Sequence, residues 1–290
     1  DSQHLRALSA ILRNGSFEAA AAELGVTQSA ISQRLKALEE NVGVKLVHRE
    51  KPCSGTKAGL RIAAHADHMQ AMEQSLAVDL GKHVDTHQGR LRIATNADSL
   101  ATWFLDAVAS VPEFLYGIHV DDQDFSDDLL RRGEVSAAVT SNSSALGGCD
   151  VHYLGKLVYV ATASPDFAER YFPNGVDAQS MSRAPMLRYN EKDDLLFQWL
   201  DHNFAGKIRP PFHLIPSSEA YAAASEAGLG WGLNPVALIK ESLIKGDLIE
   251  ICPEAPLEVP LYWQVSRLHQ DLLAPLTRRI CQTTIQTLPQ

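Results

Sequence analysis

The stretch between residues 16 and 41 constrains the fold of this chain more than any other. Ser16 can cap a short alanine-rich helix, because its hydroxyl accepts an unpaired N–H of the first turn. Gly25 suits the left-handed conformation that closes such a helix. Val26 is then predicted to be buried in a tight turn, and Thr27 to cap a second helix. Two short helices joined by a glycine-containing turn predict a helix-turn-helix, a motif of DNA readers.

The second predicted helix has two faces of different chemistry. Ile31, Leu35 and Leu38 recur on one face and are predicted to pack on the first helix. The opposite face of the helix carries hydroxyl groups, an amide and a cation. Such groups suit phosphate oxygens and base edges. A solvated face has the same pattern, but the caps, the turn and the basic segment that follows favour DNA contact. The predicted DNA-binding residues are Thr27, Gln28, Ser29, Ser32, Gln33, Arg34, Lys36, Arg49 and Lys57.

Further segments flank this motif. Residues 3–14 predict a first helix, and residues 42–59 predict a wing with several cations around its turn, which are expected to contact phosphates. Residues 58–82 contain no proline and predict one long helix. Ile62 and Met69 belong to an apolar repeat of seven residues along it, which indicates a dimerising helix, although polar residues at other seam positions make it a poor coiled coil.

From residue 91 onward, strand-like and helical segments alternate, which is typical of an α/β fold. Ligands of such sheets bind at the carboxyl ends of the strands. A terminal helix is predicted at 271–288. The predicted strands are 91–95, 118–120, 135–140, 157–162, 186–189, 212–215, 231–233, 248–252 and 261–265.

Charge and composition narrow the class of protein. The 290 residues are enough for about two domains. The net charge of −9 argues against a protein that coats nucleic acid, but residues 1–60 hold eight lysines and arginines against six acidic residues. The remaining residues hold 18 basic against 29 acidic side chains. A locally basic module on an acidic body is expected where one end binds DNA.

The sequence predicts a cytoplasmic protein without a membrane span. It has no run of 18 apolar residues and no apolar signal segment, and its four cysteines are scattered as reduced thiols would be. No nucleophile–base set, phosphate loop or complete set of metal ligands is visible. We therefore predict no catalytic residues, no cofactor and no bound metal.

Residues 3–60 resemble the winged helix-turn-helix of LysR-type transcriptional regulators. The remainder resembles the branch of that family that responds to basic amino acids, known from regulators of lysine and arginine export. The first match rests on Gly15-Ser16-Phe17, Ala19-Ala20, Leu24, residues 27–33, Leu38-Glu39, Gly43, Leu46, Arg49 and Gly59. The second rests on residues 96–104, 131–135, 217–219, 228–232 and 261–264. Together they cover essentially the whole chain.

The resemblance implies an all-α winged helix-turn-helix domain plus linker helix, followed by a two-lobed α/β domain like that of periplasmic binding proteins. The implied boundaries are 1–57 for the DNA-binding domain, 58–87 for the dimerising linker helix and hinge, and 88–290 for the effector-binding domain, with lobe 1 at about 88–162 and 267–290 and lobe 2 at about 163–266. It also implies a homodimer or tetramer on double-stranded operator DNA, and RNA polymerase as a partner if the protein is an activator.

The effector is expected between the lobes. After the first strand, the turn at residues 96–102 opens a helix whose free N–H groups can bind an α-carboxylate, although Asp98 or Ser99 can simply cap that helix. The acidic residues Asp121, Asp122 and Asp124 can face a cationic group or form a solvated loop. Residues 217–219 can close on the ligand from the second lobe. The predicted effector-binding residues are Asn96, Asp98, Ser99, Thr102, Asp122, Thr140, Ser217 and Glu219.

We therefore predict a DNA-binding regulator that senses lysine, arginine or histidine, with a basic amino acid exporter gene as the target implied by the family. The same fold sensing another metabolite is the main alternative. A solute-binding protein would need an export signal and would lack residues 1–60, and an enzyme has no visible reacting set.

Overall fold

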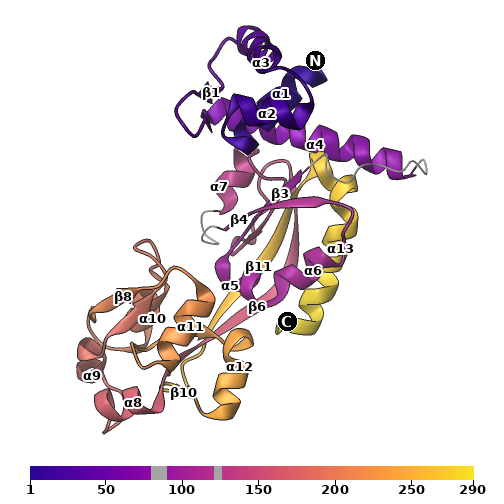
Figure 1. Ribbon diagram of the computed structural model, residues 1–290. Coiled ribbons are helices and arrows are strands. Elements are labelled where there is room, and N and C mark those ends of the chain that lie inside the picture. Colours follow the sequence, from indigo (N-terminus) through magenta and orange to yellow (C-terminus); the bar gives the residue numbers. More distant parts are fainter. Residues whose placement is uncertain (80–89, 121–125) are drawn as a thin grey trace.

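The computed structural model describes residues 1–79, 90–120 and 126–290 (Figure 1). The predictions for Asp121, Asp122 and Asp124, and for the hinge that follows residue 79, lie outside the described residues. Of the helices within these ranges, none is both long and apolar enough to cross a membrane.

The N-terminal head is helical apart from a small wing. Its elements are α1 (Ser2–Asn14), α2 (Phe17–Leu24), α3 (Gln28–Val42), β1 (Val47–His48), β2 (Ser54–Gly55) and α4 (Lys57–Asp79). The predicted caps are confirmed, because Ser16 Oγ accepts the Ala19 N–H at 3.0 Å and Thr27 Oγ1 accepts that of Ala30 at 3.2 Å. Gly25 closes α2 with a φ of 62°. Val26 is half-buried rather than buried, since it packs at the edge of the head's apolar core.

The wing is held tightly between α3 and α4. The carboxylate of Glu39 accepts the Leu46 N–H at 2.9 Å and the Lys45 ammonium at 2.8 Å, which fixes the start of the wing to α3. On the other side, a Cβ added to Gly59 would lie 1.9 Å from the Leu46 carbonyl oxygen. Only glycine therefore allows α4 to pass this close beneath the wing.

The described part of the remaining chain contains one seven-stranded sheet in the order β10-β6-β11-β5-β3-β4, with β9 paired to β6. β3 is parallel to β4 and β5, whereas β11 is antiparallel to β5 and β6. Its strands are β3 (Arg90–Thr95), β4 (Leu115–Val120), β5 (Ala137–Thr140), β6 (Cys149–Ala163), β9 (Gly232–Pro235), β10 (Ile249–Glu250) and β11 (Leu257–Ser266). Every strand predicted here from the sequence is present, with shifted ends.

The long strands β6 and β11 run through both lobes (Figure 1). Because Tyr262–Val265 of β11 pair with β5 in the first lobe, the change of lobe falls within β11 rather than after residue 266. The helical elements of the first lobe are α5 (Ala97–Ser99), the π-helical turn η1 (Leu100–Phe104), α6 (Leu105–Ala109), α7 (Ser126–Arg131), the 3₁₀ turn η2 (Arg267–His269) and α13 (Gln270–Thr287).

The second lobe is built around a parallel pair of short strands and the ends of β6, β9 and β10. Its further elements are α8 (Pro165–Tyr171), α9 (Ala178–Arg183), β7 (Met186–Arg188), α10 (Leu195–Asn203), β8 (Phe212–Leu214), α11 (Ser218–Glu226) and α12 (Val236–Lys245). Its aromatic core includes Trp199 and Trp231, whose ring centroids are 5.8 Å apart. Trp231, in the glycine-rich segment before β9, is fully buried.

A buried ion pair joins the head to the first lobe. Asp67 of α4 is 1% exposed, and its Oδ2 accepts from Nε and Nη2 of Arg92 on β3 at 3.1 and 2.9 Å. Arg13 of α1 lies 3.9 Å from the other carboxylate oxygen and also pairs with Glu23 of α2. One cluster of charges therefore connects α1, α2, α4 and β3.

This cluster predicts a stability effect. Arg92→Leu leaves the Asp67 carboxylate buried without its main partner, so we expect a loss of about 3–5 kcal/mol and a lower melting temperature. The double variant Asp67→Leu/Arg92→Leu should recover most of that loss. Arg131→Ala removes an exposed pair with Asp128 at 3.6 Å and should cost less than about 1 kcal/mol. Equal melting temperatures for the two single variants would contradict this interpretation.

Candidate functional site

The predicted DNA-binding residues lie on two neighbouring parts of the head, and α3 is at its outer side, away from the sheet (Figure 1). Of the predicted residues on or just before α3, the exposed ones are Thr27, Gln28, Ser29, Gln33 and Lys36. In the wing region, Arg49 and Lys57 are exposed. The structure thus presents amide, hydroxyl and cationic groups on one helix, as an element entering a major groove requires.

Some of these groups have partners within the head. Arg34 is half-buried and donates to Gln3 Oε1 at 2.8 Å, and Lys36 lies 3.7 Å from Glu40. Ser32 is also half-buried, and the Arg49 guanidinium lies 5.3 Å from the Phe17 ring centroid. Arg34 is therefore less available to DNA than Gln33 and Lys36, which are exposed.

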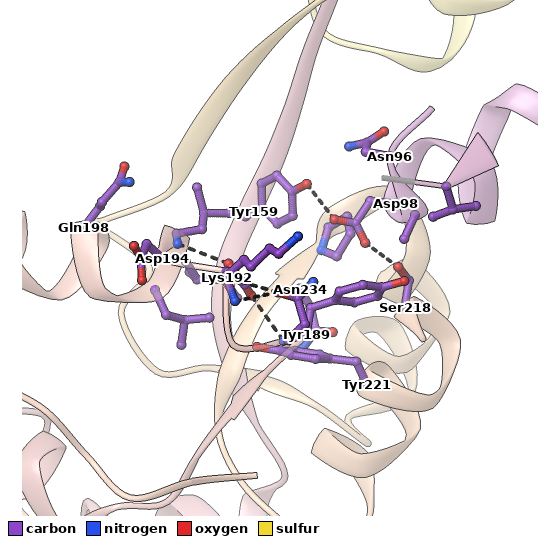
Figure 2. A pocket seen from close by; sticks show the side chains of 18 residues that line it. Asn96, Asp98, Tyr159, Tyr189, Lys192, Asp194, Gln198, Ser218, Tyr221 and Asn234 are labelled. Atoms are coloured by element: carbon purple, nitrogen blue, oxygen red, sulfur yellow. Dashed lines mark hydrogen bonds between the residues drawn. The ribbon is translucent and has the colours of Figure 1, made fainter. Parts of the chain in front are cut away.

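A cavity of about 330 Å³ lies between the two lobes (Figure 2). The turn after β3 contributes Asn96 and Asp98 from the first lobe, and Tyr159 comes from the shared strand β6. The second lobe contributes the segment 189–196, α11 and β9. This volume suits a small metabolite, and the position at the carboxyl end of β3 is where α/β sheets usually bind ligands.

The carboxylate of Asp98 bonds to both sides of this cavity. Its Oδ1 accepts from Ser218 Oγ at 2.6 Å, and its Oδ2 accepts from Tyr159 OH at 2.7 Å. Burial raises the pKa of Asp98; the two hydroxyl bonds oppose that shift without cancelling it, and the charges of Asp193 and Glu219 add to it. Among the described residues, three acidic residues and one lysine line the cavity (Asp98, Asp193, Asp194 and Lys192), and this excess of acidic groups favours a cationic ligand.

The rim of the cavity is a loop of fixed shape. Arg188 is 6% exposed. Its guanidinium donates to the carbonyls of Glu191 and Asp193 at 3.0 and 2.7 Å and lies 4.7 and 4.9 Å from the ring centroids of Phe197 and Phe212. The Asp193 carboxylate in turn accepts backbone N–H groups on both sides of the loop, at 3.2 and 3.1 Å. These bonds hold the polar groups of segment 189–196 in place before any ligand arrives.

Of the predicted effector-binding residues within the described ranges, Asn96 and Asp98 line the cavity. The others do not: Ser99, Thr102, Thr140, Ser217 and Glu219. Asn96 Oδ1 accepts the Ser99 N–H at 3.2 Å, so Asn96 caps the helix, and the interpretation that Asp98 or Ser99 is the cap is wrong. Asp122 lies outside the described residues.

Four of the residues that do not line the cavity have local structural partners, whereas the buried Ser99 hydroxyl has no hydrogen-bond partner among the described residues. Thr102 donates to the Asp98 carbonyl at 2.6 Å, and Thr140 accepts the Asn142 N–H at 3.2 Å. Ser217 caps α11 and also donates to Glu219 at 3.0 Å. Glu219 still adds negative charge near Asp98 without reaching the cavity.

Several lining residues had no local signal in the sequence: Tyr159, Tyr189, Tyr221 and Asn234. Tyr159 and Asn234 lie in strands whose neighbours are apolar core positions, and Tyr221 is in an alanine-rich helix. Ser218, which was not itself predicted as a contact, belongs to the segment 217–219 expected to close on the ligand, and it bonds to Asp98 across 120 residues of sequence.

Comparison with known proteins identifies the same two parts of the chain. Residues 2–60 match the model of the bacterial regulatory helix-turn-helix protein, lysR family, and residues 85–287 match the LysR substrate binding domain. The HTH-type transcriptional regulator LysG of Mycobacterium tuberculosis is 39% identical over 277 residues, which are 96% of this chain and 91% of that protein.

Two solved structures have the same arrangement. The crystal structure of ArgP from Mycobacterium tuberculosis has a TM-score of 0.81 at 37% identity and covers 99% of this chain and 98% of its own. Full-length LysG from Corynebacterium glutamicum with bound effector Arg has a TM-score of 0.70 at 34% identity, with all of both chains covered. The helix-turn-helix, the two-lobed domain and the similarity to these regulators all lead to the same family. The chain belongs to the LysR family of DNA-binding transcriptional regulators, of the LysG and ArgP type.

Proposed function

We propose that the cavity between the lobes binds a basic amino acid (lysine, arginine or histidine) and that its occupancy controls transcription, with a basic amino acid exporter gene as the target. The observation that supports this most directly is the Asp98 carboxylate, which lies in the cavity with hydroxyl partners but no cationic side chain bonded to it among the described residues. The relative whose structure contains arginine as its effector supports the same ligand class.

The ligand's α-ammonium pairs with Asp98, while the turn at Asn96 and Ala97 receives the α-carboxylate. A carboxylate has about four lone-pair sites, so Asp98 can keep its bonds to Ser218 and Tyr159 and still accept from an ammonium. The ligand then contacts both lobes at once. The ligand shifts the two lobes toward one arrangement only if it binds that arrangement more tightly than the other.

The DNA-bound form is a homodimer or a tetramer on double-stranded operator DNA, with RNA polymerase as a further partner if the regulator activates. The linker helix α4 supports the dimer, because its Met69, Met72 and Leu76 side chains are exposed while Ile62 packs on the head core. A two-fold dimer would read two half-sites spaced by whole helical turns.

For DNA reading, we predict different effects for two exposed residues of α3. Gln33→Ala should reduce discrimination between operator and random DNA by about 1–3 kcal/mol, since it removes a base contact. Lys36→Ala should weaken binding to all sequences and flatten the salt dependence, since it removes a phosphate contact. Gel-shift titrations at several salt concentrations measure both. Wild-type binding by the double variant would refute this role for α3.

For effector sensing, we predict that Asp98→Asn weakens lysine and arginine binding by more than about tenfold, or 1.4 kcal/mol. Because the pKa of Asp98 is raised, this carboxyl gains its proton at a higher pH than an ordinary aspartate. Wild-type affinity should therefore be greatest at neutral pH and should fall on acidification before ordinary aspartates titrate. The asparagine variant should lack this pH dependence.

Calorimetry on the full-length protein at neutral and acidic pH tests this prediction. Asp106→Asn is the matched control, because Asp106 is exposed on α6 and does not line the cavity, so its variant should bind like the wild type. Unchanged binding by Asp98→Asn would show that the carboxylate is not the cation site. A gel shift that responds to neutral or acidic amino acids, and not to lysine, arginine or histidine, would refute the effector class.

A further inference from the structure

The side chain of Asn234 on β9 is fully buried and lines the cavity. Its Nδ2 donates to Thr162 Oγ1 at 2.9 Å and to Ser225 Oγ at 3.1 Å. Its Oδ1 is also buried, and no described residue offers it a hydrogen bond. Buried carbonyl oxygens in proteins are nearly always bonded, so this atom requires a function or a partner.

The surrounding hydrogen bonds fix which end of the amide faces which way. Ser225 Oγ donates its single proton to the Tyr221 carbonyl at 3.2 Å, so it can only accept from Asn234. The NH₂ end of the amide must therefore face Ser225, and the oxygen must point elsewhere. A flipped amide would place two acceptors against each other.

Nearby hydroxyl donors are already used. Tyr221 OH donates to the Leu187 carbonyl at 2.8 Å, and Tyr159 OH donates to Asp98. Tyr159 and Asn234 lie on neighbouring strands, since Val160 of β6 is paired with Asn234. No described residue, including the other lining donors Tyr189 and Lys192, bonds to the Asn234 oxygen, so a molecule in the cavity can supply its donor.

We propose that Asn234 Oδ1 accepts an N–H from the cationic side chain of the effector and so makes the cavity select basic over neutral amino acids. This inference rests on the proposed function. Asn96 and Asp98, which receive the α-groups there, belong to the first lobe, whereas Asn234 belongs to a strand of the second (Figure 2). A ligand spanning the cavity thus brings its distal end to Asn234.

The selectivity follows from what each ligand does to this oxygen. A lysine ammonium or an arginine guanidinium gives it a charge-assisted hydrogen bond. An apolar side chain of the same length fills the same space but leaves the oxygen buried and without a hydrogen bond. This lowers the affinity for the apolar ligand strongly. Asn234 would thus reject neutral analogues while Asp98 attracts the positive charge.

The test is calorimetry on the full-length protein with lysine and with norleucine, which has the lysine carbon chain without its ε-ammonium group. Asn234→Leu should lower lysine affinity roughly 10- to 100-fold and leave norleucine affinity within about twofold of wild type or raise it. Asn234→Asp keeps the oxygen acceptor but loses the NH₂ group that donates to Thr162 and Ser225, so any general loss of affinity should affect norleucine as well, and the preference for lysine over norleucine should stay at or above that of wild type. Asn203→Leu, an exposed change on α10 of the same lobe, should bind both ligands like wild type.

Three results would overturn the inference: wild-type lysine affinity in Asn234→Leu, an equal loss of lysine and norleucine affinity, or weakened lysine binding by Asn234→Asp with norleucine binding intact. The last result also decides the question if Asn234→Leu does not fold. A wild-type protein that binds neither lysine nor arginine would instead refute the proposed function itself.

Discussion

The hydrogen bond between Asp98 and Ser218 is the contact on which the functional arrangement depends, because it joins the turn after β3 to the start of α11 on the other lobe. A carboxylate removed from water is costly unless hydrogen bonds or an opposite charge compensate it. Here Ser218 and Tyr159 compensate it in part, and the pKa of Asp98 remains raised. The site therefore holds an anionic group that a cationic ligand would stabilise further, and the two lobes meet where that ligand would bind.

The same strand that positions Asp98 also receives the main contact from the head. Arg92 lies on β3, a few residues before Asn96, and its guanidinium bonds to the buried Asp67 of α4. Any shift of β3 that accompanies ligand binding would have to move or break this ion pair. Breaking it would be costly in free energy, because the buried Asp67 carboxylate would lose its partner. We infer a physical connection between cavity and head, made of one strand and one ion pair.

Much of the fold could be predicted from the sequence, because it is encoded in local patterns. Ser16, Gly25 and Thr27 define the helix-turn-helix through capping and backbone conformation, and the alternation of strands and helices predicts the α/β domain. The long β6 was recognised only in part, because polar residues and Gly155, with a φ of 115°, interrupt its first half. Pairing with β11 stabilises that half, and such pairing does not appear in a local pattern.

The cavity was less predictable, for a related reason. Asn96 and Asp98 are in a polar turn after a strand, and that position indicates a ligand site in an α/β fold. Ser99 and Thr102 share the turn but do not line the cavity: Ser99 is buried, and Thr102 bonds to the backbone of its own helix, since helical geometry sends neighbouring side chains in different directions. Asn234 looks like one polar residue in an apolar strand, and only the folded structure shows its oxygen without a protein partner.

The division of work between Asp98 and Asn234 explains how a small site can be both attractive and selective. A charge acts over several ångströms and attracts any cation, so Asp98 alone would distinguish poorly among positively charged molecules. A neutral oxygen acts only at contact distance and only on a correctly placed N–H. Ser218 and Tyr159 hold the Asp98 carboxylate, and Ser225 holds the Asn234 amide, so both groups are positioned by the protein rather than by the ligand. Selectivity then results from the rigidity of the surrounding hydrogen bonds rather than from the number of charges in the cavity.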